Sequence, residues 1–314
     1  MNIVALDGYA MNPGDLSWES IEAFGELKVY DRTPPDQIVD RAKDAEVIIT
    51  NKVKLSKETL SNLPNLRFVI ISATGYDNVD IAACKELGIA ASNIAGYSSE
   101  SVAQHVFSVL LSHLSRAAKY VDDVARGRWQ SCEDFTFFDH PIPALNQKKI
   151  GIIGLGNIGM QVYQIFKAFG CEVYTWDKSS NRVDEVTYLP WEDMLAEVDV
   201  LTLHLPLNAD TKHLINKESL SLMKDDAILI NTARGGHIAE QNLADHLRAH
   251  PKFTALLDVL SAEPPTSGNP LIGLENCHIT PHQAWAGYAA RVKLLELMVI
   301  AIKEFINTNR GTLA

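Results

Sequence analysis

The segment KIGIIGLGNIG, residues 149–159, decides the fold of this chain. An apolar run leads directly into the pattern Gly154-x-Gly156-x-x-Gly159, and a helical pattern follows it. In a strand–turn–helix unit, the first glycine permits a tight turn, the second lets the backbone approach a pyrophosphate, and the third allows close packing of helix on strand. The segment therefore predicts a turn that binds a dinucleotide.

The residues around this turn indicate which dinucleotide it binds. Asn157 and Ile158 begin the helix, where free amide groups and the helix dipole would face the phosphates. The next apolar run, CEVYTWD, ends in Asp177, 18 residues beyond Gly159. A carboxylate at that place accepts hydrogen bonds from ribose hydroxyls and repels a 2′-phosphate. We therefore expect NAD rather than NADP as the cofactor.

Short apolar runs alternate with amphipathic stretches along the chain, which predicts α/β architecture with doubly wound parallel sheets. Strands are expected at 3–6, 47–50, 68–72, 149–154, 172–176, 200–205, 228–231 and 254–259. Helices are expected at 37–45, 157–169 and 239–250, with two longer helices at 99–126, closed by Gly127, and at 286–305. Residues 131–145 are aromatic and contain proline, and we expect an ordered excursion there.

The glycine turn lies between the two long helices, which predicts that one domain is inserted in another. We expect a Rossmann NAD domain at residues 99–285. The substrate domain, of flavodoxin-like type, would consist of residues 1–98 plus 286–314.

The composition excludes several other classes of protein. The chain has 314 residues, 46% of them hydrophobic, and a formal net charge of −11, so its surface repels nucleic-acid phosphate and anionic lipid. The N-terminal residues resemble no signal peptide, and no apolar run reaches the ~20 residues of a membrane span. The four cysteines are far apart and lack CxxC spacing, so no zinc site is indicated. We therefore expect a cytoplasmic protein that binds no nucleic acid, membrane or metal.

Three later segments each place polar residues at the end of an apolar strand. ILINTARGG (228–236) presents Arg234, TALLDVLSAEPP (254–265) presents Asp258 and then Glu263, and CHITPHQAW (277–285) presents His282. The carboxyl ends of parallel strands meet at the ligand crevice in such folds. We therefore expect these side chains to lie near a bound nicotinamide.

These residue types suit the reduction of a 2-keto acid, which needs a hydride from the cofactor and a proton on the carbonyl oxygen. His282 could supply the proton, and Glu263 could orient its ring and favour the imidazolium form. Arg234 could bind the substrate carboxylate through its planar fork. Each residue alone also fits a structural role, and spacing does not choose between His282 and His204, which ends another apolar strand.

Over essentially its full length, the chain resembles the D-isomer-specific 2-hydroxyacid dehydrogenase family. The matching segments are GIIGLGNIG, HLPLNADTKHLI, LINTARGGHI, ALLDVLSAEPP and ITPHQAWAG. The resemblance implies that Arg234, Glu263 and His282 form the catalytic triad. It also implies a substrate domain made from both chain ends, and a homodimer.

The resemblance extends to the residues that would bind substrate and cofactor. In the segment ISATGYDNVD, Ala73, Thr74 and Gly75 match the family loop whose amides hold the substrate carboxylate, together with Arg234 and His282. A turn at Gly75 with exposed N–H groups would form an anion nest. The further cofactor-binding residues implied are Leu205, Thr211, Thr232, Ala233, Arg234, Asp258 and His282.

Three features resemble glycerate dehydrogenases, also called hydroxypyruvate reductases. They are the stretch NIAGYSSESVAQHVFSVLL, the segment FTFFDHP, and Trp285 shortly after His282. Glu263 disfavours formate dehydrogenases, which have glutamine there. We expect interconversion of hydroxypyruvate and D-glycerate, with glyoxylate or another short 2-keto acid as the alternative substrate. The alternative from another class is an NAD-sensing, corepressor-like scaffold, which would not oxidise NADH with hydroxypyruvate.

Overall fold

A computed structural model describes residues 1–176, 178 and 183–313 of the chain. The chain folds into two compact units. Unit 1 consists of Met1–Ser98 and Ala286–Ala314, and unit 2 consists of Ser99–Trp285. Both units are α/β with wholly parallel sheets, so the predicted fold class is confirmed.

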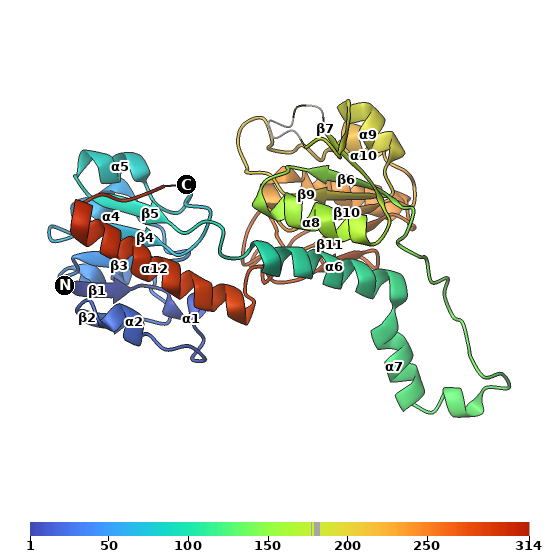
Figure 1. The fold of residues 1–314 in the computed structure, drawn as a ribbon, viewed down its shortest axis with the longest axis horizontal. Coiled ribbons are helices and arrows are strands. Elements are labelled where there is room, and N and C mark those ends of the chain that lie inside the picture. The colour runs from blue at the N-terminus through green and yellow to red at the C-terminus, as the bar shows by residue number, and fades with distance from the viewer. Residues whose placement is uncertain (177, 179–182, 314) are drawn as a thin grey trace. The chain divides into compact units, whose positions relative to one another are not determined.

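Unit 1 contains a five-stranded parallel sheet in the order β2-β1-β3-β4-β5, which is the flavodoxin-like order (Figure 1). The strands are β1 (Asn2–Ala5), β2 (Glu26–Val29), β3 (Val47–Thr50), β4 (Phe68–Ile71) and β5 (Ala90–Asn93). The helices are α1 (Gly8–Met11), α2 (Glu19–Glu22), α3 (Ile38–Ala42) with the 3-10 turn η1 (Pro35–Gln37) before it, α4 (Lys57–Ser61), α5 (Ile81–Glu86) and α12 (Tyr288–Thr308).

The sequence of the central strands explains why this sheet is covered on both faces. Every residue of β3 and β4 is buried, as expected for parallel strands between two layers of helices. On one face, Phe305 of α12 stacks on Phe68 of β4 with ring centroids 4.5 Å apart. The C-terminal helix therefore closes the core that the N-terminal strands begin.

Unit 2 contains a seven-stranded parallel sheet in the order β12-β11-β10-β9-β6-β7-β8. The strands are β6 (Lys149–Ile153), β7 (Glu172–Trp176), β8 (Thr187–Leu189), β9 (Val200–Leu203), β10 (Ile228–Asn231), β11 (Thr254–Leu257) and β12 (Cys277–Ile279). The helices are α6 (Ser99–Ser115), α7 (Ala117–Ala125), α8 (Asn157–Ala168), α9 (Trp191–Glu197), α10 (Lys217–Leu222) and α11 (Glu240–Ala249), with 3-10 turns η2 (Trp129–Ser131) and η3 (Gly235–His237). The strand order reverses between β6 and β9, as in a Rossmann domain.

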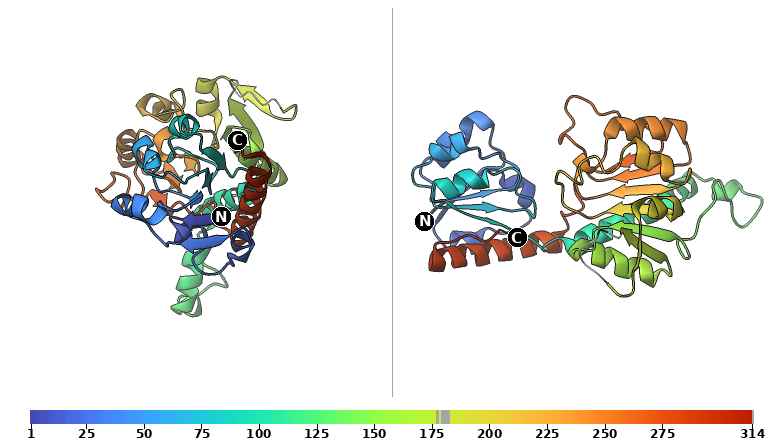
Figure 2. Two further views of the ribbon diagram at one scale, coloured as in Figure 1. Left: turned by 90° about the vertical axis from the view of Figure 1, so that its left-hand side faces the viewer. Right: turned by 90° about the horizontal axis from the view of Figure 1, so that it is seen from above.

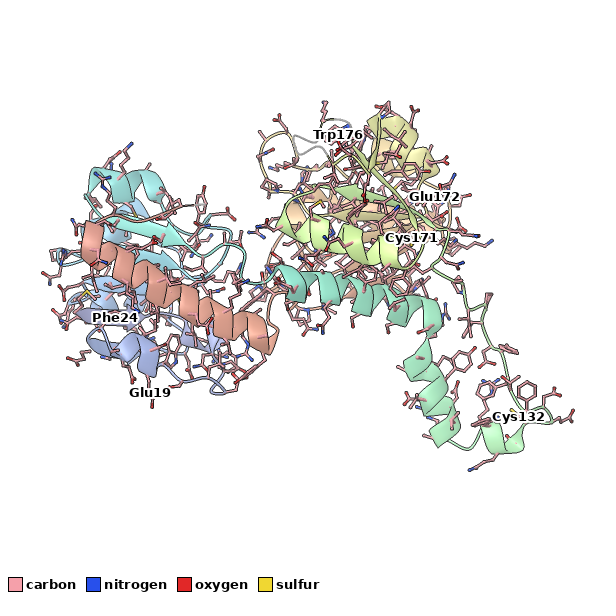
Figure 3. All side chains as sticks on the ribbon, viewed as in Figure 1. Glu19, Phe24, Cys132, Cys171, Glu172 and Trp176 are labelled. Atoms are coloured by element: carbon pink, nitrogen blue, oxygen red, sulfur yellow. The ribbon has the colours of Figure 1, made fainter. Side chains whose placement is uncertain are left out.

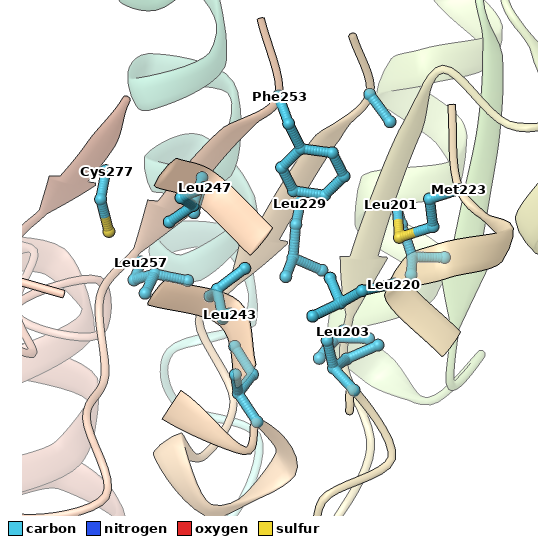
Figure 4. Packing of buried hydrophobic residues seen from close by; sticks show 14 of the residues in the cluster. Leu201, Leu203, Leu220, Met223, Leu229, Leu243, Leu247, Phe253, Leu257 and Cys277 are labelled. Atoms are coloured by element: carbon cyan, nitrogen blue, oxygen red, sulfur yellow. The ribbon is translucent and has the colours of Figure 1, made fainter. Parts of the chain in front are cut away.

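Alternate residues of the strands in unit 2 pack into two separate cores. Leu229 of β10 joins Leu243 and Leu247 of α11, in the core drawn in Figure 4. Its neighbour Ile230 points to the other face and joins the core that contains Phe166 of α8. This period of two, in a strand that is apolar throughout, places a layer of helices on each face and the strand ends at the edges.

The predicted helix at 99–126 is wrong as a single helix. α6 ends at Ser115, Arg116 adopts a left-handed conformation with φ of 49°, and α7 begins at Ala117. Burial explains the break, because α6 carries buried residues as far as Leu114 whereas α7 carries none. The amphipathic pattern of the sequence predicts a helix on both sides of the break. It does not show that burial against the rest of unit 2 stops at Leu114.

Four strands were not predicted, namely β2, β5, β8 and β12, and each lies at the edge of its sheet. They are short. β2 has no buried residue, as is common for a strand at the edge of a sheet. Several predicted strands were one or two residues too long, because apolar residues continue past the last ladder bond into the loops of the sheet edge.

A segment of unit 2, residues 117–145, projects from the seven-stranded sheet, and we call it the arm (Figures 1 and 2). It is ordered by its own contacts: the rings of Tyr120 and Phe137 are 5.5 Å apart, Trp129 Nε1 donates to Phe135 O at 2.9 Å, and Arg128 forms an ion pair with Asp139. Figure 3 shows Cys132 towards its far end. The expected ordered excursion is therefore present.

None of the described helices is both apolar enough and long enough to cross a lipid bilayer.

Candidate active site

The candidate site residues of unit 2 follow the strands at one edge of its sheet, because all seven strands run in the same direction. Five strands contribute. The residues concerned are Gly154–Gly159 after β6, Leu205 and Thr211 after β9, Thr232–Arg234 after β10, Asp258 and Glu263 after β11, and His282 after β12. In unit 2, these residues therefore all follow the carboxyl ends of parallel strands.

The glycine turn has the geometry that its three glycines predict. Gly154 has φ of 95°, and a Cβ there would lie 2.5 Å from His204 O. A Cβ on Gly159 would overlap Gly154 O, so only glycine lets α8 begin this close to β6. A Cβ on Gly156 would meet nothing within 4 Å, so its backbone is open to an approaching group.

The start of α8 adds amide donors to this open side. Its first intrahelical hydrogen bond runs from Met160 N to Gly156 O at 2.9 Å, so the amides of Asn157 and Ile158 precede the first helical donor and have no acceptor within the helix. Such a helix N-terminus favours phosphate. The residues of this turn fit the pyrophosphate of a dinucleotide.

Two glycine variants should separate these roles. Gly156→Ala should leave the melting temperature close to wild type and weaken NADH binding by at least about 10-fold, because the new methyl group fills the space open to phosphate. Gly159→Ala should lower both, because its methyl group collides with the turn itself. Thermal melts and NADH fluorescence titrations measure the two effects. Equal melting temperatures for both variants would contradict this assignment.

His282 and Glu263 form a directly hydrogen-bonded pair. His282 Nδ1 lies 2.5 Å from Glu263 Oε2, and the other carboxylate oxygen accepts a hydrogen bond from Leu260 N at 2.9 Å. The two side chains are 23% and 31% exposed, so the pair can be reached by a small molecule. Because Nδ1 faces the carboxylate, Nε2 is the ring nitrogen that can meet a substrate oxygen.

The backbone at His282 has an unusual conformation, which hydrogen bonds to neighbouring residues stabilise. His282 has φ of 51°, and its N–H donates to Asp258 O at 2.8 Å and to Thr280 O at 3.0 Å. The buried Asp258 carboxylate accepts from Gln283 N at 3.0 Å, from Ala284 N at 2.9 Å and from the Thr280 hydroxyl at 2.6 Å. Asp258 thus fixes the loop that carries the imidazole.

The sequence did not predict this role of Asp258, to which only cofactor binding was assigned. It also missed His105 of α6, whose Nε2 lies 3.0 Å from the Thr280 hydroxyl. The available signal was Thr280, a hydroxyl at the end of β12 and two residues before His282. The structure adds Thr280 and His105 to the groups that support the imidazole.

Arg234 lies in a loop that is fixed at both ends. Asn231 closes the loop, since its Nδ2 donates to Arg234 O at 2.9 Å and its Oδ1 accepts from Ala233 N at 3.0 Å. The guanidinium donates to Ala233 O at 2.8 Å. The next residue, Gly235, packs so closely on Leu260 that a Cβ would overlap its backbone. The Arg234 loop therefore lies directly beside the loop that carries Glu263.

The surroundings of His282 and His204, between which the sequence does not choose, differ in the groups that face each ring. Burial lowers the pKa of His204 to about 3, so this ring stays neutral at every ordinary pH. Its Nε2 lies 2.9 Å from the hydroxyl of the buried Thr202. A ring of this kind cannot act as a proton donor, whereas His282 has the carboxylate partner that the chemistry needs.

Thr232 gives a second test of whether a cofactor fits. Its hydroxyl oxygen is buried and has no hydrogen-bond partner within the described part of the chain. Buried hydroxyls are nearly always satisfied, so an orphaned one beside the Arg234 loop fits a polar group of a bound molecule. Thr232 and Ala233 thus lie where a cofactor could contact them.

The remaining predicted residues of unit 2 divide into described and undescribed ones. Leu205 lies against the glycine turn, with its N atom 3.1 Å from where a Gly154 Cβ would be. Thr211 lies in the loop that begins at Leu205, and its hydroxyl donates to Pro206 O at 2.8 Å. Asp177 lies outside the described residues. Among those described, no cluster of His, Cys, Asp or Glu side chains could hold a metal ion.

In unit 1, the predicted carboxylate loop follows β4. Ala73 O accepts from Ile94 N at 3.1 Å, and Thr74 O accepts from Asn93 Nδ2 at 2.6 Å. Both carbonyls therefore face the end of β5, and the amides of Thr74 and Gly75, which share their peptide planes, point the other way. The turn is made without a positive φ at Gly75, so the glycine is not required by left-handed geometry.

Comparison with known proteins agrees with this geometry. Residues 107–284 match the family model "D-isomer specific 2-hydroxyacid dehydrogenase, NAD binding domain". A hydroxypyruvate reductase from Blautia hydrogenotrophica is 40% identical over 312 residues, which cover 98% of this chain and 97% of that protein.

Two solved structures extend the comparison to the fold. An acyclic imino acid reductase in complex with NADPH and D-Arg superimposes with a TM-score of 0.85 at 30% identity, covering 99% of this chain and 98% of the other. A D-lactate dehydrogenase from Aquifex aeolicus, complexed with NAD and lactic acid, gives a TM-score of 0.81 at 30% identity, covering 98% and 96%. The chain belongs to the D-isomer-specific 2-hydroxyacid dehydrogenase family, and its unit 2 contains the family's NAD-binding domain.

Proposed function

We propose that this enzyme uses NADH to reduce hydroxypyruvate to D-glycerate, and that it catalyses the reverse reaction with NAD. The observation that carries the proposal is the His282–Glu263 pair, 2.5 Å apart, at the sheet edge that also carries the glycine turn. The relative from Blautia hydrogenotrophica supports hydroxypyruvate as the substrate.

The proposed chemistry assigns one task to each side chain of the triad. When bound, NADH supplies the hydride that reduces the C2 carbonyl. His282 donates the Nε2 proton to the carbonyl oxygen, and Glu263 stabilises the imidazolium that this step consumes. Arg234 binds the substrate carboxylate and polarises the keto group. In the oxidation, His282 takes the proton back, so both directions balance.

The other predicted contacts keep their proposed roles. The amides of Ala73, Thr74 and Gly75 would bind the substrate carboxylate, which is consistent with carbonyls that face β5 instead. The cofactor would be held by the glycine turn, Leu205, Thr211, Thr232, Ala233 and Asp258. The Asp258 carboxylate already accepts three hydrogen bonds from the His282 loop, so it also acts as a support for that loop.

A panel of 2-keto acids tests the proposal against its rivals. Purified enzyme with NADH should give the highest kcat/KM with hydroxypyruvate. Glyoxylate should be reduced within about 10- to 200-fold of this, because pockets discriminate weakly over one carbon unit. A higher kcat/KM with glyoxylate would favour the alternative substrate. No NADH oxidation with any keto acid, despite NADH binding, would favour the scaffold.

Cofactor preference rests on Asp177, which we propose binds the adenosine ribose hydroxyls. The imino acid reductase was solved with NADPH, so this fold accommodates both cofactors. We expect a kcat/KM for NADH at least about 10-fold above that for NADPH, and a smaller ratio in Asp177→Ala. Equal kcat/KM values in the wild type would remove the assignment.

Replacing Glu263 by glutamine should shift the pH profile of the reduction, because it removes the charge that lies 2.5 Å from the imidazole of the proposed proton donor. Profiles of kcat for reduction from pH 5 to 9 measure this shift. Unshifted profiles would rule out Glu263 as the partner of the catalytic histidine.

We also propose that the enzyme is a cytoplasmic homodimer and that the arm contributes to the contact between the two copies. The arm exposes six large hydrophobic side chains, and exposed apolar surface of this amount is typical of an interface. They are Val121, Val124, Trp129, Phe135, Phe138 and Ile142. Light scattering should give twice the mass of one chain, and Phe135→Asp with Phe138→Asp should shift the equilibrium to monomer. An unchanged mass in the double variant would exclude the arm.

A further inference from the structure

The loop that carries His282 is bound by two side chains of one helix, α6 (Figure 1). The Ser101 hydroxyl donates to Ala284 O at 2.7 Å, and His105 Nε2 lies 3.0 Å from the Thr280 hydroxyl. Ser101 and His105 are four residues apart, so they lie on the same face of the helix. Thr280 precedes His282 by two residues, and Ala284 follows it by two. α6 therefore binds the loop on both sides of His282 in the chain.

The direction of the contact between His105 and Thr280 follows from the second partner of the hydroxyl. Thr280 Oγ1 lies 2.6 Å from the buried carboxylate of Asp258, which also accepts from the amides of Gln283 and Ala284. A carboxylate only accepts hydrogen bonds, so the single hydroxyl hydrogen points to it. The hydroxyl oxygen then offers only lone pairs, and His105 Nε2 must be the donor. A neutral ring with its hydrogen on Nε2 is sufficient for this bond.

The hydrogen bonds from His105 through Thr280 to Asp258 end at the backbone of His282. Asp258 O accepts from His282 N at 2.8 Å, so the residue that receives the Thr280 hydroxyl also binds the amide of His282. His105 Nε2 lies 3.5 Å from Asp258 Oδ1, and the two side chains are 14% and 1% exposed. Because solvent is largely excluded here, a lost donor would leave a polar atom without a replacement.

His282 needs such support because its backbone lies in the left-handed region, with φ of 51°. Residues with a side chain adopt this region rarely, and they keep it only where the surrounding contacts over-determine it. Without the contacts from α6, the loop can relax and the imidazole would move relative to Glu263. A displacement of about 1 Å can lower the rate of an enzyme about 100-fold. Contacts that hold the loop therefore act on catalysis.

We propose that His105 and Ser101 are positioning residues for the catalytic histidine, and that they fix the 280–284 loop so that His282 keeps its place beside Glu263 during proton transfer. The inference rests on the proposed function in taking His282 as the proton donor. It adds a dependence of kcat on two residues of α6, both of which act through the loop.

Two variants of His105 test the role of its N–H donor. Leucine removes the donor, whereas glutamine keeps an amide N–H of similar reach. With hydroxypyruvate and saturating NADH, kcat should fall at least about 10-fold in His105→Leu and stay within about 3-fold of the wild type in His105→Gln. KM for NADH should rise less than kcat falls, because the glycine turn follows a different strand. Equal losses in the two variants would overturn the donor role.

Replacing Thr280 by valine removes the hydroxyl that receives this hydrogen bond and nearly keeps the shape of the side chain. kcat should fall at least as much as in His105→Leu, because the bond to Asp258 is lost as well. The double variant should be no slower than Thr280→Val alone, since both changes break the same series of hydrogen bonds. Fully additive losses would show that His105 acts through another contact, and they would overturn the proposal.

Ser101→Ala tests the second contact between α6 and the loop. kcat should fall by about 3-fold, less than in His105→Leu, because the Asp258 carboxylate still accepts from Ala284 N. A wild-type kcat in Ser101→Ala would remove Ser101 from the proposal.

His113→Leu is the matched control on the same helix. His113 lies eight residues further along α6, and its ring faces that of His278 at a centroid distance of 5.6 Å. This variant should keep the wild-type kcat. A loss as large as that in His105→Leu would show that any such change in α6 slows the enzyme, and it would overturn the specific role of His105.

Hydrogen exchange measures the state of the loop without any substrate. The amides of His282, Gln283 and Ala284 all donate to Asp258. They should exchange at least about 5-fold faster in His105→Leu than in the wild type, and at the wild-type rate in His105→Gln. The amides of α8 should not change in either variant.

These outcomes separate the positioning role from the proposed function. If the wild type does not reduce hydroxypyruvate but the loop exchanges as expected, the substrate assignment fails and the positioning role stands. If exchange of the loop is unchanged in His105→Leu, the positioning role is overturned, whichever keto acid the enzyme reduces.

Discussion

Replacing His282 by alanine should lower kcat for hydroxypyruvate reduction by at least ~100-fold, within the ~10²–10⁴ range for general acid–base catalysis. The reason is structural as well as chemical. The Glu263 carboxylate, 2.5 Å from Nδ1, would lose the ring that carries the proton. NADH binding should change much less, because the glycine turn follows a different strand. Stopped-flow or steady-state assays at saturating NADH measure the loss.

His282→Asn tests the same role with less disturbance of the backbone. His282 has φ of 51°, a conformation that asparagine adopts more easily than alanine, so the loop over Asp258 should keep its shape. His213, with φ of 52°, gives a control of the same kind when it is also replaced by asparagine. Near-normal turnover in both His282 variants would end the assignment of His282 as the proton donor.

Replacing Arg234 by alanine should lower kcat/KM by about 10²–10³, the cost of losing a charged donor aimed at the reacting group. The loss should appear in KM as well as kcat, because the guanidinium is proposed to bind the carboxylate in ground state and transition state alike. Arg234→Lys should recover only part of the activity, since an ammonium cannot form the bidentate pair.

Added guanidinium can test whether the loss of activity in Arg234→Ala is due to the missing guanidinium group. Activity of Arg234→Ala should rise with guanidinium chloride at concentrations that do not unfold the enzyme, and the wild type should not respond. Arg248→Ala, which removes an exposed arginine of α11 paired with Asp245, is the matched control and should retain full activity. A retained KM in Arg234→Ala would show that the carboxylate is bound elsewhere.

The buried strands and the glycine turn could be predicted because each depends on local chemistry. Runs such as ILIN at β10 are buried on both faces, and the bounds of this strand were predicted to the residue. The three glycines occupy positions where a Cβ would collide or where backbone must stay open, so sequence and geometry agree. The alternation of strands and helices predicted two parallel sheets, which the structure contains.

The parts that could not be predicted depend on contacts between distant segments. The break at Arg116 occurs where α6 leaves its packing partner, which no window of sequence shows. Asp258 was assigned to the cofactor because it ends a strand, but three of its hydrogen bonds go to Thr280, Gln283 and Ala284.

The four cysteines differ in burial, so that one of them can be labelled selectively. Cys84, Cys171 and Cys277 are buried, and burial raises the pKa of their thiols to about 11, 11 and 12 respectively. Cys132 is partly exposed and lies in the arm. A maleimide dye at neutral pH should therefore attach at residue 132 first. Differently labelled samples, when mixed, would then test the proposed homodimer by energy transfer without any engineered cysteine.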